Sequence, residues 1–162
     1  MKLIDKFFSI LFQLNSKTLV TDSDDEMGVL EQLKSQICEN ITMFAEKYNE
    51  EFDPYLPGFI SQVWTLLDSL DTKAKYDILV SNAIRFLCIV ADRGLHKEIF
   101  EKEQILQQLC SRVIIPNMRF RESDEELFED NPEEYIRRDV EGADIQTRRR
   151  AACDLVKALS KH

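Results

Sequence analysis

Residues 30–48 read LEQLKSQICENITMFAEKY and carry the strongest helical pattern in the chain. Its large apolar side chains recur at spacings of three and four residues, at Leu30, Leu33, Ile37, Ile41, Phe44 and Tyr48. Because a helix has 3.6 residues per turn, this spacing places them on one face and predicts an amphipathic helix packed against a neighbour. Ser23 and Glu26 stand just before it in the Ser-x-x-Glu order of a capping box, which predicts where the helix begins.

The same spacing recurs on both sides of this stretch. It predicts further helices over residues 2–14, 54–70, 76–90 and 105–115, and a last helix from about residue 145 to residue 160. Pro54 is expected at the first helical position that proline favours. Gly94 and Pro116 are expected to end the helices that precede them.

The order of these helices predicts an all-α fold, because no window alternates apolar and polar residues as a strand would. Two antiparallel pairs, residues 27–70 and 74–115, are each about forty residues long, the period of HEAT and armadillo-like repeats. Helices this apolar must stack on neighbours, which predicts one HEAT-repeat α-α superhelix over residues 1–162. Residues 2–14 and 145–160 are expected to belong to neighbouring repeats of a longer solenoid, so that the isolated chain would self-associate.

The charge balance restricts the class of partner. The 162 residues include 30 acidic and 21 basic side chains, a net charge of −9. Nucleic-acid binding depends on lysine and arginine contacts to phosphates, so direct nucleic-acid binding is not expected, and basic protein partners fit better. The sequence holds no apolar run of the roughly 18 residues that membrane insertion needs.

Motifs for catalysis, cofactors and metals are missing from the sequence. It contains no Gly-rich phosphate loop, no His-Glu-x-x-His and no Cys-x-x-Cys. The interpretation is therefore a protein that is not an enzyme. His96 follows Gly94 in a polar turn and is expected to be solvated. Four dispersed cysteines at apolar helical positions are expected to be reduced and buried: Cys38, Cys88, Cys110 and Cys153.

Residues 117–144 form an acidic insertion between the predicted helices. Ten of the residues 122–141 are Asp or Glu, yet four large apolar residues lie among them: Leu127, Phe128, Tyr135 and Ile136. This mixture favours an ordered segment anchored by its apolar residues and presenting carboxylates outward. A long acidic loop is supported equally well by the composition. A short helix is expected to begin at Asn131–Glu134, with a stop at Gly142.

Arg148, Arg149 and Arg150 are consecutive in an otherwise acidic chain. The favoured interpretation is that they pair with nearby carboxylates. Two alternatives stay open: a phosphate or nuclear-localisation patch, and a ladder of charges along the concave face of a solenoid.

Five stretches carry a resemblance to a known family: Leu33–Cys38, Tyr55–Pro57, Lys75–Ile84, Glu129–Asp139 and Thr147–Leu155. They resemble the central HEAT repeats of the exportins that return importin-α to the cytoplasm, in the importin-β superfamily. The resemblance runs from about Phe12 to Leu159. The run EEYIRR from Glu133, followed by RRRAACDL from Arg148, is not generic solenoid sequence, although a shorter form of the first run, around Pro132 to Arg137, also recurs in related importins.

The resemblance implies a nuclear transport receptor that shuttles between nucleus and cytoplasm. Such receptors bind the GTP form of the small GTPase Ran, here together with importin-α, and pass pore proteins. In this family an insertion in a central repeat touches Ran, and that role falls on Glu133, Glu134, Tyr135, Arg137, Arg138 and Asp139. The family is several times longer, and the amino-terminal arch that grips Ran has no counterpart here. A HEAT-repeat scaffold unrelated to Ran is the alternative function.

Overall fold

The structure is a computed structural model that describes residues 2–14, 19, 23–141 and 147–161. Across these residues the chain forms helices and turns, without a strand. The all-α prediction is confirmed.

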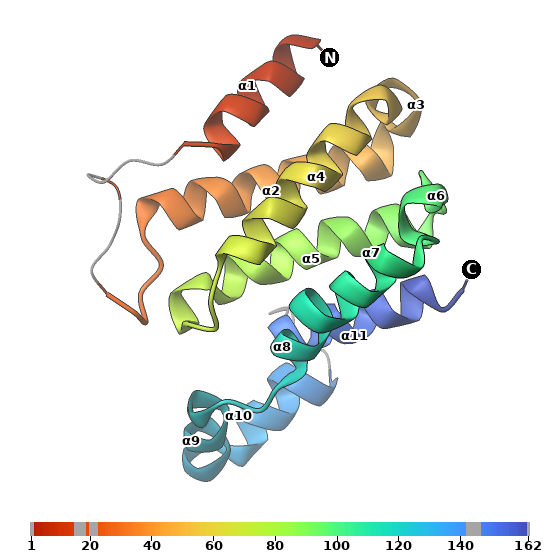
Figure 1. The fold of residues 1–162 in the computed structure, drawn as a ribbon. Coiled ribbons are helices and arrows are strands. Elements are labelled where there is room, and N and C mark those ends of the chain that lie inside the picture. The colour runs from red at the N-terminus through yellow and green to blue at the C-terminus, as the bar shows by residue number, and fades with distance from the viewer. Residues whose placement is uncertain (1, 15–18, 20–22, 142–146, 162) are drawn as a thin grey trace.

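The helices form two layers, between which the chain alternates (Figure 1). One layer holds α1 (Lys2–Phe12), α4 (Leu56–Ser69) and a composite helix made of α7 (Glu103–Gln108), the π-helical segment η3 (Leu109–Ile114) and α8 (Ile115–Met118). The other holds α2 (Val29–Lys47), α5 (Asp77–Asp92) and α11 (Arg148–Leu159), where α5 packs against both neighbours. This arrangement is the stacked α-α superhelix that the sequence predicts. The repeat boundaries at 27–70 and 74–115 stay a prediction.

Short elements connect the long helices. They are α3 (Asn49–Phe52), the 3₁₀ turns η1 (Asp53–Tyr55) and η2 (Ala74–Tyr76), and α6 (Lys97–Phe100). The insertion comprises α9 (Glu122–Asp130), α10 (Pro132–Ile136) and the π-helical segment η4 (Arg137–Glu141), and it protrudes from one end of the layers (Figure 1). Pro54 lies in η1, so α4 begins two residues later than predicted.

The core lies between the layers and between successive helices. Its largest fully buried side chains include Ile41, Phe52, Leu56, Phe59, Leu79, Ile84, Phe86 and Leu87. Each such side chain contributes about 1.5–3 kcal/mol by leaving water. Helix α5 is buried on more than one face, because α2 and α11 cover opposite sides of it. This position makes α5 the central element against which the insertion is anchored.

Helix α5 ends at Asp92, and Gly94 forms its C-terminal cap, as predicted. The Gly94 N–H donates to Ala91 O and the Leu95 N–H donates to Val90 O, which is the Schellman pattern. Gly94 has φ 63°, a left-handed conformation that glycine adopts without a Cβ penalty. His96 follows with φ 50°, and its Nε2 lies 3.2 Å from Asp53 Oδ1. The expectation of a solvated His96 is wrong, since the ring is half-buried and joins this turn to η1.

The capping box at Ser23 does not begin a helix. Ser23 Oγ accepts hydrogen bonds from the N–H groups of Asp25 and Glu26, which forms a local turn, and α2 begins later, after Gly28. A serine hydroxyl can satisfy a turn as well as a helix terminus, so the same sequence order has two outcomes.

Pro116 does not end its helix. The preceding segment η3 widens to π geometry, and the Ile115 N–H donates to Cys110 O, five residues back. The helix then continues through Pro116 to Met118. A proline ring clashes with the carbonyl four residues back, and the wider turn moves that carbonyl away.

One prediction about burial is corrected. Cys110, on η3, is exposed, whereas Cys38 is buried and Cys88 and Cys153 are half-buried. The π-helical turn changes the helical phase at Cys110, so the apolar spacing no longer indicates which face is inside. On α1, the apolar side chains of Leu3 and Phe7 are exposed, as the expectation of self-association requires. The self-association itself stays a prediction.

Candidate functional site

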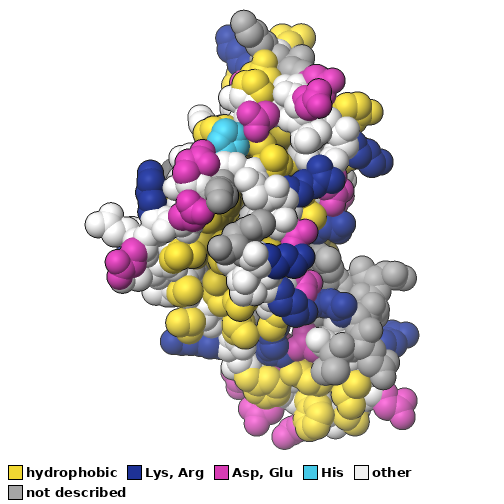
Figure 2. Space-filling view, turned by 90° about the vertical axis from the view of Figure 1, so that its right-hand side faces the viewer, with side chains coloured by type: hydrophobic (Ala, Val, Ile, Leu, Met, Phe, Trp, Pro, Cys, Tyr) yellow, Lys and Arg dark blue, Asp and Glu magenta, His cyan; other side chains and the backbone are white. Residues whose placement is uncertain are grey.

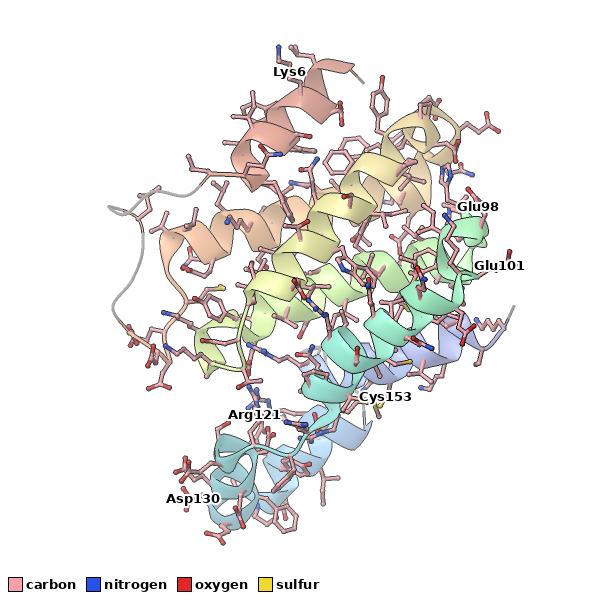
Figure 3. All side chains as sticks on the ribbon, in the orientation of Figure 1. Lys6, Glu98, Glu101, Arg121, Asp130 and Cys153 are labelled. Carbon is pink, nitrogen blue, oxygen red and sulfur yellow. The ribbon has the colours of Figure 1, made fainter. Side chains whose placement is uncertain are left out.

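The insertion begins where Arg121 leaves the solenoid, and its far tip carries Asp130 (Figure 3). Helix α9, which the sequence reading missed, begins at Glu122. The Arg121 N–H donates to Asp124 Oδ2 at 2.8 Å across the first turn. Acidic side chains in a first helical turn are favoured because they face the positive end of the helix dipole. The acidic residues from Glu122 onward could therefore have indicated the start of this helix.

Helix α10 begins where the sequence predicts. Asn131 Oδ1 accepts a hydrogen bond from the Glu134 N–H at 3.1 Å, and Pro132 occupies the first helical position. Both features are ordinary N-terminal signals. The predicted stop at Gly142 lies outside the described residues.

Aromatic side chains connect α9 to α10. The Tyr135 ring meets Phe128 edge-on, with centroids 5.4 Å apart, and meets Phe120 with centroids 6.0 Å apart. Phe120 and Phe128 nevertheless remain 55% and 47% exposed. Figure 2 shows apolar side chains gathered at the lower end of the molecule, with acidic side chains beside them. The insertion is helical rather than a long loop, which decides between the two interpretations left open, but apolar burial is not its main anchor.

The main anchor is an ionic cluster, here called the junction, formed by Asp77, Arg121, Asp124, Asp139, Arg148 and Arg149. Arg121 forks onto Asp77 at the start of α5, with Nη1–Oδ1 and Nη2–Oδ2 distances of 2.8 and 3.0 Å. The hydrogen bonds to Asp77 raise the pKa of the Arg121 guanidinium further above its ordinary value. Paired hydrogen bonds of this kind stabilise the contact and also fix the orientation of the guanidinium group relative to the carboxylate.

Arg148 approaches the same carboxylate from α11. Its Nε donates to Asp77 Oδ1 at 2.6 Å, and its two Nη atoms donate to the carbonyls of Asp71 and Lys73 at 2.9 and 2.6 Å. Only 5% of the side chain is exposed, and this burial lowers the pKa of Arg148 while Asp77 opposes the shift. A guanidinium this deep requires its full set of acceptors.

Arg149 joins α11 to the insertion. Its Nη2 donates to Asp124 Oδ2 at 2.8 Å, and its Nη1 donates to Tyr135 Oη at 2.6 Å and to Asp139. Its guanidinium also lies 5.5 Å from the Phe120 ring centroid. The prediction that the arginine triplet pairs with carboxylates is thus confirmed for Arg148 and Arg149.

Thr147 and Arg150 complete the start of α11. Thr147 Oγ1 accepts from the Arg150 N–H at 3.2 Å, as an N-cap, and donates to Asp139 Oδ1 at 2.5 Å. Arg150 Nη1 is buried and has no hydrogen-bond partner among the described residues. Helix α11 begins at Arg148, and the expected residues 145 and 146 lie outside the described part.

The six residues assigned by family resemblance fall into two groups. Tyr135 and Asp139 face inward and contact Arg149, and Arg138 Nε is buried without a partner in the described part of the chain. These three residues therefore lie where they can hold the insertion in place, rather than on its accessible surface.

Of the other three, Glu133 and Arg137 face outward, whereas Glu134 is half-buried. Glu133 is exposed, Arg137 is 63% exposed, and Arg137 forms an ion pair with Glu134 one turn away. These side chains belong to the accessible surface of α10 and η4. Sequence reasoning missed Asp77, Arg121 and Asp124, for which no local pattern indicates a shared role.

Other kinds of site find no support in the described residues. No described helix is long and apolar enough to cross a membrane. Within the same part of the chain, no group of three or more His, Cys, Asp and Glu side chains is placed to hold a metal ion.

Comparison with known proteins decides the family. The sequence matches the Cse1 family over residues 1–162. The chain belongs to the Cse1 family. It is 57% identical to Exportin-2 of Oreochromis niloticus and 56% identical to Exportin-2 of Homo sapiens, each over 154 residues. Those alignments cover 95% of this chain and 16% of the relatives, so the chain spans about a sixth of their length.

A solved structure of the family has the same fold. It shows the exportin Cse1 in its cargo-free, cytoplasmic state and superposes with a TM-score of 0.92 at 38% sequence identity. The match covers 99% of this chain and 18% of that one. The helical solenoid of the Cse1 family is therefore present here.

Proposed function

We propose that this chain acts within a nuclear export receptor that binds Ran in its GTP form and carries importin-α from the nucleus to the cytoplasm. The observation that carries the proposal is the 56–57% identity to Exportin-2 across 95% of the chain. The receptor shuttles between the two compartments, contacts pore proteins and catalyses no reaction. The net charge of −9 supports association with basic partners, because opposite potentials steer encounter.

The insertion would contact Ran through its outward side chains. Glu133 and Arg137 are exposed, so a partner reaches them without rearrangement of the insertion. Glu134 accompanies them as the ion-pair partner of Arg137. Tyr135 and Asp139 would position this surface through Arg149 rather than contact Ran themselves.

The junction gives the insertion a means to affect the solenoid. Arg121 and Arg148 bind one carboxylate, Asp77, at the start of the central helix α5. A partner that moved the insertion would pull on Arg121 and thereby on the packing between α5 and α11. The insertion would in this way help to set how open the superhelix is.

The test is binding of this chain to immobilised Ran loaded with GTP or GDP, by biolayer interferometry. The double variant Glu133→Lys, Glu134→Lys reverses two charges on α10. A control is Glu50→Lys, Glu51→Lys, a pair of consecutive exposed glutamates on α3. Reversed rim charges mainly change the association rate and the salt dependence of binding.

The expected result is a preference for the GTP form that weakens about tenfold in the α10 variant and less than about twofold in the α3 variant. Equal or absent binding of the two nucleotide forms by a helical sample would contradict a GTP-dependent Ran contact in this segment. That result would instead favour a HEAT-repeat scaffold not linked to Ran.

A further inference from the structure

We propose that Ser23 is a phosphorylation site for an acid-directed serine kinase, and that Lys73 and Lys75 hold its phosphate. Ser23 and Glu26 have the sequence order of a capping box, but in the structure they form a turn, and α2 begins only after Gly28. The motif is therefore left without the role that its order predicts. This site is independent of the proposed contact with Ran.

Three consecutive carboxylates follow Ser23: Asp24, Asp25 and Glu26. Their side chains are exposed, and residues 23–26 form a bend rather than a helix. A kinase whose substrate groove is lined with basic side chains selects a serine followed by carboxylates, because complementary charges determine which substrate is bound. A bend can adapt to such a groove, whereas the hydrogen bonds of a helix would first have to break.

The reaction transfers the γ-phosphoryl group of ATP to the hydroxyl of Ser23. The Ser23 oxygen bonds to the γ-phosphorus, the bond from that phosphorus to the oxygen of the β-phosphate breaks, and ADP leaves. The hydroxyl proton passes to a carboxylate of the kinase. The product carries about −1.5 to −2 charges at neutral pH and three acceptor oxygens. Beside three carboxylates, such a group is stable in a fixed position only where cations face it.

Two lysines of the loop before α5 supply these cations. Lys73 Nζ lies 2.8 Å from Asp24 Oδ1, and Lys75 Nζ lies 3.8 Å from the same oxygen, which is longer than a hydrogen bond. The Lys75 side chain is only 7% exposed, and its ammonium donates no hydrogen bond to another described residue. Buried polar groups are almost always hydrogen-bonded, so Lys75 indicates an anion at this turn. Asp24 is 61% exposed, so an anion can reach this side of the ammonium from solvent.

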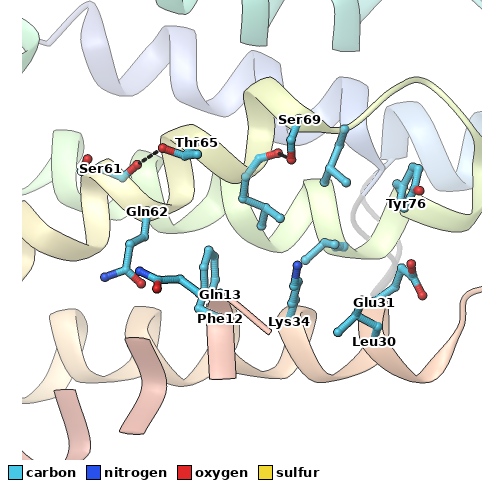
Figure 4. Close-up of a pocket in the computed structure, with 13 residues that line it drawn as sticks. Phe12, Gln13, Leu30, Glu31, Lys34, Ser61, Gln62, Thr65, Ser69 and Tyr76 are labelled. Atoms are coloured by element: carbon cyan, nitrogen blue, oxygen red, sulfur yellow. Dashed lines mark hydrogen bonds between the residues drawn. The ribbon is translucent and has the colours of Figure 1, made fainter. Parts of the chain in front are cut away.

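The backbone holds both lysines in place for this contact. The Lys75 N–H donates to Asp24 O at 3.1 Å, which joins the loop to the turn. On the other side of the loop, the Lys73 carbonyl accepts from Arg148 Nη2 at 2.6 Å. The Lys75 ammonium also lies 5.3 Å from the ring centroid of Tyr76, a residue that lines the cavity between α1, α2 and α4 (Figure 4). The phosphate would therefore meet cations whose positions are already restricted.

The chain contains a second serine in a similar acidic sequence. Ser123 is exposed and is followed by the three carboxylates of residues 124–126. It lies in the first turn of α9, where two arginines of the junction bind the first of these carboxylates. A kinase would have to unwind α9 to bind Ser123 in its groove. The fold should therefore protect Ser123 and leave Ser23 available.

The first test incubates the folded chain with an acid-directed serine kinase of the casein-kinase type and Mg-ATP, and locates the phosphate by fragmentation mass spectrometry. Peptides of residues 18–30 and 118–130 measure the same serines outside the fold. Both peptides should be phosphorylated, whereas in the folded chain Ser23 should react at least about tenfold faster than Ser123. A phosphate on Thr21 instead of Ser23, equal rates at Ser23 and Ser123 in the folded chain, or no phosphate on Ser23 would overturn the proposal.

The second test follows the phosphate by phosphorus NMR during a pH titration. Lys73 and Lys75 favour the doubly charged phosphate, so its second pKa should lie at least about 0.5 below that of the phosphorylated peptide, which carries the same carboxylates. Lys73→Gln and Lys75→Gln should each bring this pKa closer to the peptide value, whereas Lys47→Gln, exposed at the opposite end of α2, should not.

The two lysine variants differ in their risk to the fold. Lys75 is buried, but the Lys73 side chain is 44% exposed, so Lys73→Gln tests the contact even where Lys75→Gln unfolds the chain. Equal phosphate pKa values in the folded chain and the peptide, or a value that Lys73→Gln leaves unaltered, would overturn the lysines as partners of the phosphate.

Discussion

Arg148 Nε lies 2.6 Å from Asp77 Oδ1, which joins α11 to α5 across 71 positions of sequence. The same carboxylate also holds Arg121 at the edge of the insertion. One side chain at the start of the central helix thus connects both the following repeat helix and the insertion.

We predict that Asp77→Asn destabilises the chain by about 2–4 kcal/mol, because it leaves the buried Arg148 without its charge partner. Arg148 is 5% exposed, so water cannot replace the lost carboxylate. Urea unfolding followed by circular dichroism measures the change.

The control is Asp68→Asn, which breaks an ion pair with Arg112. These side chains are 42% and 60% exposed, and exposed pairs contribute less than about 1 kcal/mol. Equal losses of stability in the two variants would show that Arg148 does not rely on Asp77.

Arg149→Met should release the insertion while leaving the solenoid folded. The substitution removes the contacts of Arg149 to Asp124, Asp139 and Tyr135 but keeps an apolar stem against Phe120. Hydrogen exchange of α9 and α10 should become about tenfold faster or more, whereas exchange in α2 should not change. Arg112→Met serves as the control, and unaltered exchange in α9 after Arg149→Met would mean that the insertion is held without the contacts of Arg149.

The layered helices were predictable because each is long and strongly periodic. The apolar spacing from Leu30 to Tyr48 has one helical interpretation, and Gly94 has one function at a helix end. The prediction that Pro116 ends its helix was wrong, because whether a proline ends a helix depends on the geometry of the turn before it. That geometry is set by packing and leaves no local signal.

The sequence showed that an acidic insertion exists, but it did not show which residues anchor the insertion to the solenoid. The arginine triplet indicated pairing with carboxylates, yet the chain offers 30 acidic side chains as partners. Selecting Asp77 requires knowing that α5 and α11 are neighbours, which is a property of the stacked fold. Phe128 and Ile136 suggested apolar anchoring because sequence alone does not distinguish a buried aromatic residue from an exposed one.

Gly94→Ala should destabilise the chain by about 1–2 kcal/mol, since an alanine at φ 63° brings its Cβ close to the carbonyl oxygen. Gly58→Ala is the matched control within α4, where an added Cβ meets no atom within 4 Å. It should stabilise the chain by about 0.5–1 kcal/mol, because alanine is the better helix former. Thermal unfolding compares the two, and a stabilising Gly94→Ala would contradict the Schellman cap.

The junction should also make the insertion sensitive to acid through Asp124. Burial favours the neutral form of this carboxyl, but the Arg121 N–H and the charges of Arg121 and Arg149 prevail and hold its pKa below the ordinary value of 3.8. A pKa that is lower in the folded state stabilises the fold above about pH 3.8 and loses that effect as the pH falls below it. The Tyr135 ring signals in NMR should therefore shift toward those of an undocked insertion under acid conditions, and Asp124→Asn should show the undocked signals already at neutral pH. Asp130→Asn, at the exposed tip, should leave the transition unchanged. A carboxyl signal of Asp124 that titrates above pH 3.8 would contradict its stabilisation by the two arginines.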